Sequence, residues 1–394
     1  MKIALFSDTF SPEINGVTKN LDKLVNYFSN NGIEYLIFAP EYKNKTKNIH
    51  EKNIIRMKSY DFLLYPDLKF AVPNYQRVKK VLNEEKIDLV HLVTPFNIGL
   101  IGLYFAKQND IPIIASYHTN FDQYLDYYNI NFLEKAAWIY MRWFHGNASL
   151  NLCPSKITLE ALKKREFSNL DVWGRGIDTD LFSPEHKSKN FIEKNDLEGK
   201  IKMLYVGRAA KEKNIYLLLE SLNILNKKYG DLLELIITGD GPELENLKKA
   251  APENVVFTGF KNGLELSQIY ASSDIFVFSS LTETYGNVII EAMASGLPVV
   301  AVNSGGVKEN LINNYNGLTC EKDNPVEFSR ILEKLILNNK LRDILGHNAR
   351  QYSLEKKWKK VFENLIKNYI KVLDKDKKHG GNKGIMSKKE KSIV

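Results

Sequence analysis

Short apolar runs alternate with amphipathic stretches along most of the chain. Runs such as 2–6 and 202–206 have the length and the β-branched or aromatic content of buried strands. Between such runs, apolar residues recur at three- and four-residue spacing, as Leu21, Leu24 and Phe28 do, which is typical of an amphipathic helix. Strands that alternate with helices predict a parallel sheet, and the alternation begins again in the second half of the chain.

Two series of strand–helix repeats predict two Rossmann-like α/β domains facing each other across a cleft. A chain of 394 residues is also too long for one ordinary core. We expect an N-terminal domain at 1–175 and a C-terminal domain at 176–354, with a polar linker around 175–200. A helix at 355–373 would pack back toward the first domain, and the Gly- and Lys-rich residues 374–394 predict a disordered tail.

The most informative stretch is the strand–helix–strand pattern at 276–301. Its strand-to-helix turn would lie at the carboxyl end of a parallel sheet, where such folds place their ligands. Glu283 lies in the turn and Glu291 in the helix. Both could be ordinary solvated acids, but Glu291 lies between Ile290 and Ala292 on an apolar helix. A buried carboxylate there needs a partner, and a ligand hydroxyl would serve.

Two helix starts suit an anion. Gly286 and Asn287 begin the helix that contains Glu291 and would offer free backbone N–H groups. Gly16, ahead of the first helix of the chain, would let the backbone approach a phosphate, although an ordinary turn glycine is an equal interpretation. No G-x-G-x-x-G pattern follows the first strand, so a standard dinucleotide site is not supported.

Cations and a histidine follow other predicted strands. Arg208 and Lys213 lie beyond the first strand of the second domain and would neutralise a pyrophosphate, unless they are surface charges like Lys211. His118 ends a strand of the first domain, where it could serve a site or be structural. Phosphate-binding cations together with carboxylates for sugar hydroxyls suggest a sugar nucleotide.

Composition narrows the class of protein. Hydrophobic residues make up 44% and charged residues 26% of the chain, as in soluble globular proteins. The apolar stretches are too short for a membrane span and the N-terminus lacks the pattern of a signal peptide. Cys153 and Cys320 are far apart, so we expect a cytoplasmic protein without a disulfide framework.

The net charge of +8 is unevenly distributed. Residues 1–175 carry 22 basic and 18 acidic side chains, and residues 374–394 carry 7 and 3. The excess of basic side chains in these two regions has two interpretations. It favours peripheral contact with an anionic membrane, or it serves only to keep the protein soluble. No nucleic-acid-binding motif accompanies the charge, so no nucleic-acid partner is expected. The aromatic segment 121–144 suits either core packing or a bilayer interface.

Six motifs give the chain a resemblance to a known family. They read SDTFSPEINGVT, SYHTNFDQYLDYY, VWGRGIDTDLF, VGR with Lys213, TGDGP and ETYGNVIIEAMASGLPVV. Together they resemble the retaining glycosyltransferases of family 4, which have the two-domain GT-B fold, over about residues 1–372. The sequence around these motifs is most similar to bacterial α-mannosyltransferases and to glycolipid glucosyl- or sulfoquinovosyltransferases. Thr284 and Tyr285 stand where the family commonly has Pro-Phe.

The resemblance implies a role for each residue in binding a nucleotide sugar. Glu291 would bind the ribose, and Glu283 the transferred sugar. Arg208 and Lys213 would hold the pyrophosphate and stabilise the leaving nucleoside diphosphate. His118 would face the transferred sugar. The residues that would bind the phosphates through their backbone are Gly16, Gly286, Asn287 and Val288.

Such enzymes form an α-glycosidic bond with retention at the anomeric carbon. No side chain is an obvious nucleophile, so front-face attack by the acceptor hydroxyl is expected. Stabilisation of the leaving phosphate should be the largest catalytic effect. Asp178 and Asp180 form a D-x-D pattern, but at a predicted turn, so neither a metal nor another cofactor is expected.

Other classes stay open. A different Rossmann-type nucleotide-binding enzyme is one alternative, but the G-x-G-x-x-G pattern is absent. A sugar phosphorylase is a second, but it would need a lysine that binds pyridoxal phosphate, and no such sequence pattern is seen. A non-catalytic glycan-binding protein is the third alternative. GDP-mannose and UDP-glucose are equally compatible with the motifs, as are lipid and glycan acceptors. Recognition of the base would depend on loops near Gly239 and Gly259.

Overall fold

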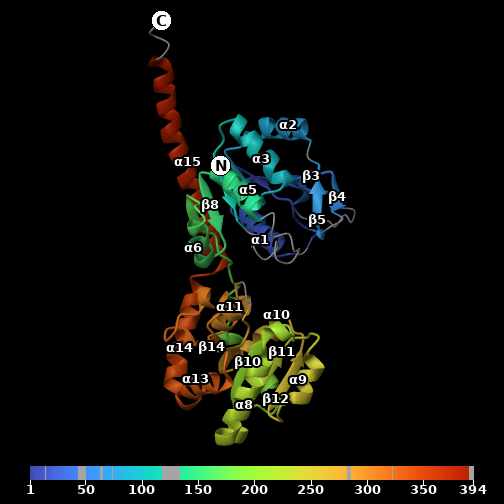
Figure 1. The fold of residues 1–394 in the computed structure, drawn as a ribbon, viewed down its shortest axis with the longest axis vertical. Helices are drawn as coiled ribbons and strands as arrows, with labels where there is room; N and C mark the ends of the chain where they lie inside the picture. Colours follow the sequence, from blue (N-terminus) through green and yellow to red (C-terminus); the bar gives the residue numbers. More distant parts are fainter. Residues whose placement is uncertain are drawn as a thin grey trace. The chain divides into compact units, whose positions relative to one another are not determined.

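The chain forms two compact units, Met1–Arg175 with Val361–Val394 and Gly176–Lys360 (Figure 1). The computed structural model describes residues 1–13, 15–42, 50–62, 65–72, 74–117, 134–281, 285–321 and 323–389.

A parallel seven-stranded sheet, in the order β3-β2-β1-β6-β7-β8-β9, forms the centre of the first unit. Its strands are β1 (Lys2–Phe6), β2 (Glu34–Pro40), β3 (Ile54–Met57), β6 (Leu89–Leu92), β7 (Ile113–Ser116), β8 (Leu150–Cys153) and β9 (Leu170–Val172). Central strands such as β1 are buried almost throughout, which explains why they read as continuous apolar runs. A separate antiparallel pair is formed by β4 (Ser59–Phe62) and β5 (Tyr65–Ala71).

The helices of the first unit begin and end where local chemistry dictates. Their bounds are α1 (Gly16–Asn30), the 3-10 turn η1 (Glu51–Asn53), α2 (Tyr75–Glu85), α3 (Asn97–Gln108), α5 (Glu134–Gly146) and α6 (Lys156–Lys164). At the start of α1 the Asn15 side chain accepts from the backbone of Val17 and Thr18, and Thr18 completes a capping box. The buried face of this helix includes Leu21 and Phe28, as the spacing predicts.

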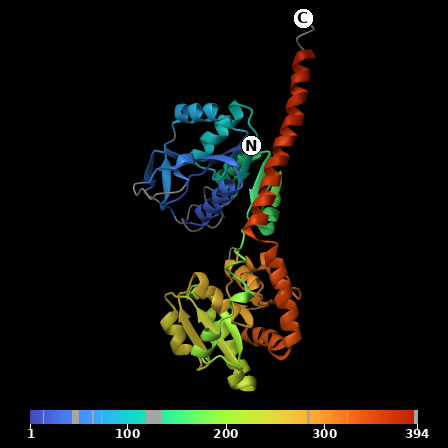
Figure 2. The same ribbon diagram turned by 180° about the vertical axis from the view of Figure 1, so that it is seen from behind.

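The last helix, α15 (Trp358–Lys389), belongs to the first unit from Val361 onward (Figure 2). The Tyr369 hydroxyl lies 2.7 Å from Nδ1 of His91, and Asn368 donates to Asp171 at 2.8 Å. A disordered tail is predicted from residue 374, whereas the helix continues to Lys389. Extending an existing helix costs far less than nucleating one, which favours continuation through a polar sequence.

The second unit contains a parallel six-stranded sheet in the order β12-β11-β10-β13-β14-β15. Its strands are β10 (Ile201–Val206), β11 (Leu233–Thr238), β12 (Val255–Gly259), β13 (Ile275–Phe278), β14 (Val299–Val302) and β15 (Gly317–Cys320). The chain runs outward from β10 to β12 on one side and from β13 to β15 on the other. The strand order therefore reverses between β10 and β13, which is where open α/β sheets bind ligands.

Helices surround this sheet, and together the two parallel sheets confirm the prediction of two Rossmann-like domains. The longer helices are α8 (Ile215–Tyr229), α9 (Leu244–Ala250), α10 (Gly263–Ala271), α11 (Asn287–Ala294), α13 (Pro325–Leu337) and α14 (Asn339–Leu354). The shorter elements are η3 (Pro184–His186), α7 (Lys189–Lys194), η4 (Lys211–Lys213), η5 (Gly230–Leu232) and α12 (Val307–Asn310).

The stretch expected to be a linker is part of the second unit. Phe182 and Leu197 are buried in its core, and α7 lies between them. Polar residues dominate this stretch, so the two apolar side chains that attach it to the core leave no periodic pattern in the sequence.

Candidate functional site

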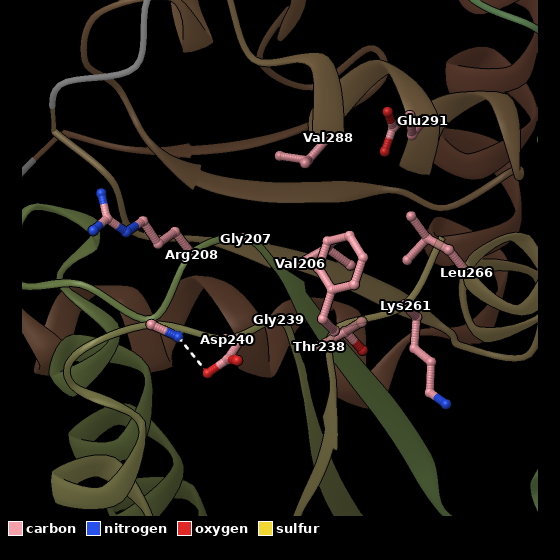
Figure 3. Close-up of a pocket in the computed structure, with 12 residues that line it drawn as sticks. Val206, Gly207, Arg208, Thr238, Gly239, Asp240, Lys261, Leu266, Val288 and Glu291 are labelled. Atoms are coloured by element: carbon pink, nitrogen blue, oxygen red, sulfur yellow. Dashed lines mark hydrogen bonds between the residues drawn. The ribbon is translucent and has the colours of Figure 1, made fainter. Parts of the chain in front are cut away.

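A cavity of ≈ 560 Å³ opens where the strand order of the second sheet reverses (Figure 3). Gly207 and Arg208 follow β10, and Thr238 ends β11. Val288 and Glu291 come from α11 on the far side of the reversal. The carboxyl edge of the sheet therefore brings together segments that are far apart in the sequence.

Glycine lets two of these segments run against each other. Gly239 has a φ of +142°, and a Cβ at that position would lie 1.9 Å from the carbonyl oxygen of Gly207. Backbone hydrogen bonds fix the contact, because Gly207 N–H donates to Thr238 at 3.0 Å and Gly239 N–H donates to Gly259 at 2.9 Å. Any other residue at position 239 would force the loops apart, so the site needs glycine there.

Glu291 is a partly buried acid with one side-chain partner. The hydroxyl of Tyr270, on α10, donates to Oε2 of Glu291 at 3.0 Å. Burial raises the pKa of the Glu291 carboxyl to about 7, although the Tyr270 hydrogen bond lowers it. No other side chain in the described part of the chain hydrogen-bonds this carboxylate. The carboxylate is thus partly removed from solvent, and it lines the cavity as a hydrogen-bond acceptor.

The helix that contains Glu291 begins without a side-chain cap. Gly286 is its N-cap residue, in the left-handed conformation (φ 75°), and makes no side-chain cap hydrogen bond. Asn287 and Val288 are the next two residues, as predicted, and Val288 lines the cavity. The preceding turn is fixed by Asn310, which donates to the Tyr285 carbonyl at 2.7 Å. Backbone N–H groups at such a start attract anions.

The two predicted cations are placed differently. Arg208 lines the cavity, and Figure 3 shows it on the side opposite Lys261 and Leu266. Lys213 is not among the residues that line this cavity. It ends η4, and its carbonyl accepts from the Ser279 hydroxyl at 2.8 Å, which ties this turn to the end of β13.

Three predicted site residues do not enter this arrangement. His118 and Glu283 lie outside the described residues. Gly16 begins α1 in the first unit, where a Cβ would lie 3.1 Å from Nη2 of Arg175. The roles that the sequence assigns to these three residues stay predictions.

The D-x-D pattern forms a turn. Oδ1 of Asp178 accepts from the backbone N–H groups of Asp180 and Leu181 at 3.2 and 3.0 Å. Asp180 pairs with Lys357 at 3.1 Å. Among the described residues there is no cluster of three potential metal ligands. These contacts account for both aspartates structurally, and independence of metal and of other cofactors stays a prediction.

The aromatic segment divides between core and surface from Glu134 on; residues 118–133 lie outside the described part of the chain. On α5, Trp138 and Phe144 are buried. Ile139 and Trp143 are 61% and 53% exposed. Within the described residues, no helix is long and apolar enough to cross a membrane.

Sequence reasoning missed several residues of the cavity. Phe260 and Lys261 line the cavity from a loop, and Tyr270, which hydrogen-bonds Glu291 without lining the cavity, looks like an ordinary apolar-face residue of α10. The only signal in the sequence is Gly259, which marks the end of β12 and the turn that follows.

Two family models match the chain. The model described as Glycosyltransferase Family 4 matches residues 14–181, and the model described as Glycosyl transferases group 1 matches residues 187–352. Together they span most of both units.

Three known proteins illustrate the likeness. A GDP-mannose-dependent alpha-mannosyltransferase of Mycobacterium tuberculosis is 30% identical over 380 residues, covering 94% of this chain and 97% of its own. An alpha-monoglucosyldiacylglycerol synthase of Streptococcus pneumoniae is 28% identical, covering 95% and 89%. The crystal structure of Anabaena HepE in complex with UDP superposes with a TM-score of 0.70 at 19% identity, covering 94% and 100%. At that identity the structural likeness shows the fold alone.

Proposed function

Because this chain belongs to glycosyltransferase family 4, has the GT-B fold and is a hexosyltransferase, we propose that it transfers mannose or glucose from a nucleoside diphosphate sugar to a lipid or glycan hydroxyl. The bond formed is α-glycosidic, with retention at the anomeric carbon. The mannosyltransferase and glucosyltransferase relatives support both sugars, and the diacylglycerol named for the Streptococcus pneumoniae enzyme supports a lipid acceptor.

The observation that carries this proposal is the cavity that Glu291 and Arg208 share. The cavity wall carries the partly buried carboxylate of Glu291 at one position and the guanidinium of Arg208 at another. A carboxylate accepts hydrogen bonds from the two ribose hydroxyls, while the guanidinium and the uncapped start of α11 suit the pyrophosphate. Together these groups match the ribose and phosphates of a sugar nucleotide.

The chemistry follows from where charge develops. The bond between the anomeric carbon and the phosphate oxygen breaks, and the nucleoside diphosphate leaves with the electron pair. Arg208, Lys213 and the N–H groups of Asn287 and Val288 stabilise this charge. The acceptor hydroxyl attacks the same face and gives its proton to the leaving phosphate. Glu283 orients the transferred sugar and His118 faces it, as the sequence predicts.

Substitution of the two glutamates tests these roles. We expect Glu291→Ala to weaken donor binding and Glu283→Ala mainly to lower kcat. The full chain is assayed with a panel of nucleoside diphosphate sugars, scored by release of the nucleoside diphosphate. Glu245→Ala, which removes an exposed acid of α9, is the control. Near-normal kcat/KM in both variants would refute the assignment, and the absence of turnover with every donor would favour a non-catalytic glycan-binding protein.

For a lipid acceptor, the exposed face of α5 supplies a membrane contact. Ile139 and Trp143 lie one helical turn apart, so they share a face, and beside them is Arg142, which is exposed and pairs with Glu166 at 2.9 Å. Apolar and aromatic side chains flanked by cations suit the interface of an anionic bilayer, where each cation contributes about 1 kcal/mol. Peripheral contact with the inner face of the cell membrane is therefore part of the proposal.

Sedimentation with lipid vesicles tests this contact. We expect the chain to sediment with vesicles containing phosphatidylglycerol, and the double substitution of Ile139 and Trp143 by Ser to lower the bound fraction severalfold. Leu232→Ser, which changes a similarly exposed residue of the second unit, is the control. A chain lacking residues 374–394 separates any contribution of the basic tail. If the double variant sediments like the control, α5 does not bind the bilayer.

A further inference from the structure

Tyr270 is fixed in the core beside the candidate site. It lies on α10, and its side chain is fully buried. The ring packs edge-on against Phe182 at a centroid distance of 5.7 Å, and in a tilted arrangement against Phe276 of β13 at 5.8 Å. Aromatic pairs of this kind stabilise one ring position beyond what burial alone does. The core of the second unit therefore sets where the Tyr270 hydroxyl lies.

The Tyr270 hydroxyl has two acceptors within reach, and both belong to α11. Oε2 of Glu291 lies at 3.0 Å, and the carbonyl oxygen of Val288, one turn earlier in the helix, lies at 3.3 Å. A phenol has a single hydrogen, so it donates to one acceptor at a time, while its oxygen can also accept. The hydroxyl can therefore change its acceptor without any movement of the ring.

The two carboxylate oxygens of Glu291 have different surroundings. Oε2 is bound by Tyr270, which does not line the cavity. Oε1 has no hydrogen-bond partner among the described residues, and Glu291 itself lines the cavity (Figure 3). Oε1 is thus the oxygen that is left for a ligand.

Glu291 has two protonation states near neutral pH, because burial raises the pKa of its carboxyl to about 7. In the ionised state Oε2 accepts from Tyr270, and Oε1 is an acceptor. In the neutral state the proton can lie on Oε2 and be donated to the Tyr270 oxygen, while the Tyr270 hydrogen turns to the Val288 carbonyl. Oε1 is then the carbonyl oxygen of the acid, so it still accepts. Burial also raises the pKa of Tyr270 well above its ordinary value, which keeps its hydroxyl protonated.

The other titratable groups around α11 lie on neighbouring elements and on the cavity wall. β13 and β14 carry none, and Tyr205 of β10 is close enough to Tyr270 to raise its pKa. Arg350 of α14 donates to the carbonyl of Ala294, at the last residue of α11. The charged groups of the cavity wall, α10 and α12 are Arg208, Asp240, Lys261, Glu265, Lys308 and Glu309. Within the described part of the chain, only Tyr270 hydrogen-bonds the Glu291 side chain.

We propose that Tyr270 is a positioning residue of the donor site, which keeps Oε1 of Glu291 available to accept from a ribose hydroxyl in both protonation states of the acid. Tyr270 does not line the cavity, so it acts only through Glu291. This role rests on the proposed function, in which Glu291 binds the ribose. Donor binding should in consequence respond little to the titration of Glu291.

Isothermal titration of the full chain with GDP and with UDP, at pH 6 and pH 8, tests this role. Tyr270→Phe removes the hydroxyl and keeps the ring that packs against Phe182 and Phe276. We expect the variant to bind about 3-fold more weakly than the native chain at pH 8, and at least about 10-fold more weakly at pH 6. At pH 6 the proton of Glu291 is no longer directed to Oε2, so the acid can present an O–H to the ribose in place of an acceptor. Comparison with the native chain at each pH removes the titration of the nucleotide itself.

Tyr369→Phe is the matched control. It removes a hydroxyl from an equally buried tyrosine of the first unit, 2.7 Å from Nδ1 of His91. The control should bind both nucleotides as the native chain does at both pH values, and thermal denaturation shows how much stability each variant loses. If Tyr270→Phe weakens binding by the same factor at pH 6 and pH 8, or not at all, Tyr270 is only a core residue and the proposal is wrong.

Glu291→Gln separates this role from the donor site. An amide does not titrate, and with its oxygen bound to Tyr270 it presents an NH2 group to the ribose. It should therefore weaken both nucleotides by a similar factor at the two pH values, and adding Tyr270→Phe should introduce no pH dependence. If Glu291→Gln weakens binding but Tyr270→Phe acts equally at both pH values, the donor site stands without the role of Tyr270. If Glu291→Gln binds as the native chain does, Glu291 does not hold the nucleotide and both proposals are wrong.

Discussion

The two units differ at the point where the strand order of their sheets reverses. In each sheet the strand order reverses once, between β1 and β6 in the first unit and between β10 and β13 in the second. Each unit has a carboxylate near this reversal, the buried Asp8 in the first and the partly buried Glu291 in the second. The difference between them lies in how many hydrogen bonds the protein itself supplies.

Asp8 is satisfied by its own domain. Its carboxylate accepts from the N–H of Ile98 at 2.9 Å, the N–H of Gly99 at 3.4 Å and the hydroxyl of Thr94 at 2.6 Å. It thus caps the start of α3 from 90 residues away. Burial still raises its pKa. The helix start that could bind an external anion is occupied by a side chain.

By comparison, the described part of the protein supplies few hydrogen bonds to Glu291 and no side-chain cap to the start of α11. Tyr270 is the one side chain among the described residues that hydrogen-bonds Glu291, and Gly286 makes no side-chain cap. A buried acid with a full set of internal partners is structural, whereas one that lines a cavity with a single partner is available to a ligand. The number of internal partners, together with exposure to the cavity, therefore distinguishes the two roles.

The largest expected effect is on Asp8. Asp8→Ala leaves the N–H groups of Ile98 and Gly99 without their acceptor in a buried position, and should cost about 3 kcal/mol of unfolding free energy. Urea unfolding followed by tryptophan fluorescence measures this loss, since three of the four tryptophans lie in residues 1–175. Glu84→Ala, which removes an exposed acid of α2, is the control. A loss no larger than that of the control would contradict the structural role.

A smaller effect of opposite sign is expected for Glu291. Its pKa is raised in the folded state from 4.5 to about 7, so the fold favours the neutral acid. The stabilisation is fully present below pH 4.5 and is lost as the pH rises through 7. Glu291→Gln keeps a neutral side chain at every pH, so at pH 8 it should be more stable than the native chain by at most about 3 kcal/mol.

Thermal denaturation at pH 5 and pH 8 checks this prediction. The two proteins should have similar midpoints at pH 5 and diverge at pH 8, while the variant loses donor affinity at both. A gain in stability combined with a loss of binding is the pattern expected of a residue selected for its ligand. Equal pH dependence in the two proteins would show that Glu291 is not the titrating group.

Local patterns predicted much of this arrangement. The apolar runs predicted the strands of both sheets, and the position of Glu291 between Ile290 and Ala292 predicted a buried carboxylate, which in the structure is partly buried. Arg208 and Val288 could be expected near it because parallel strands end at one edge of a sheet. These predictions rest on periodicity, which a single sequence displays.

The remainder depends on contacts between distant residues. Tyr270 reaches Glu291 across 21 positions, and Asp8 reaches α3 across 90. Lys213 seemed equivalent to Arg208, but it ends the short turn η4 and is not among the residues that line the cavity. Phe182 and Leu197 are buried in a stretch that is polar overall. Contacts between residues that are distant in the sequence leave no periodic pattern from which they could be predicted.

The return of α15 to the first unit has a consequence for synthesis. Residues 1–175 leave the ribosome first, yet Tyr369, which is fully buried there and contacts His91, is made only after the whole second unit. At about 5–20 residues per second, the first unit waits on the order of ten seconds for its last helix. The second unit, continuous in sequence, can finish folding first, so the order of folding is the reverse of the order of translation.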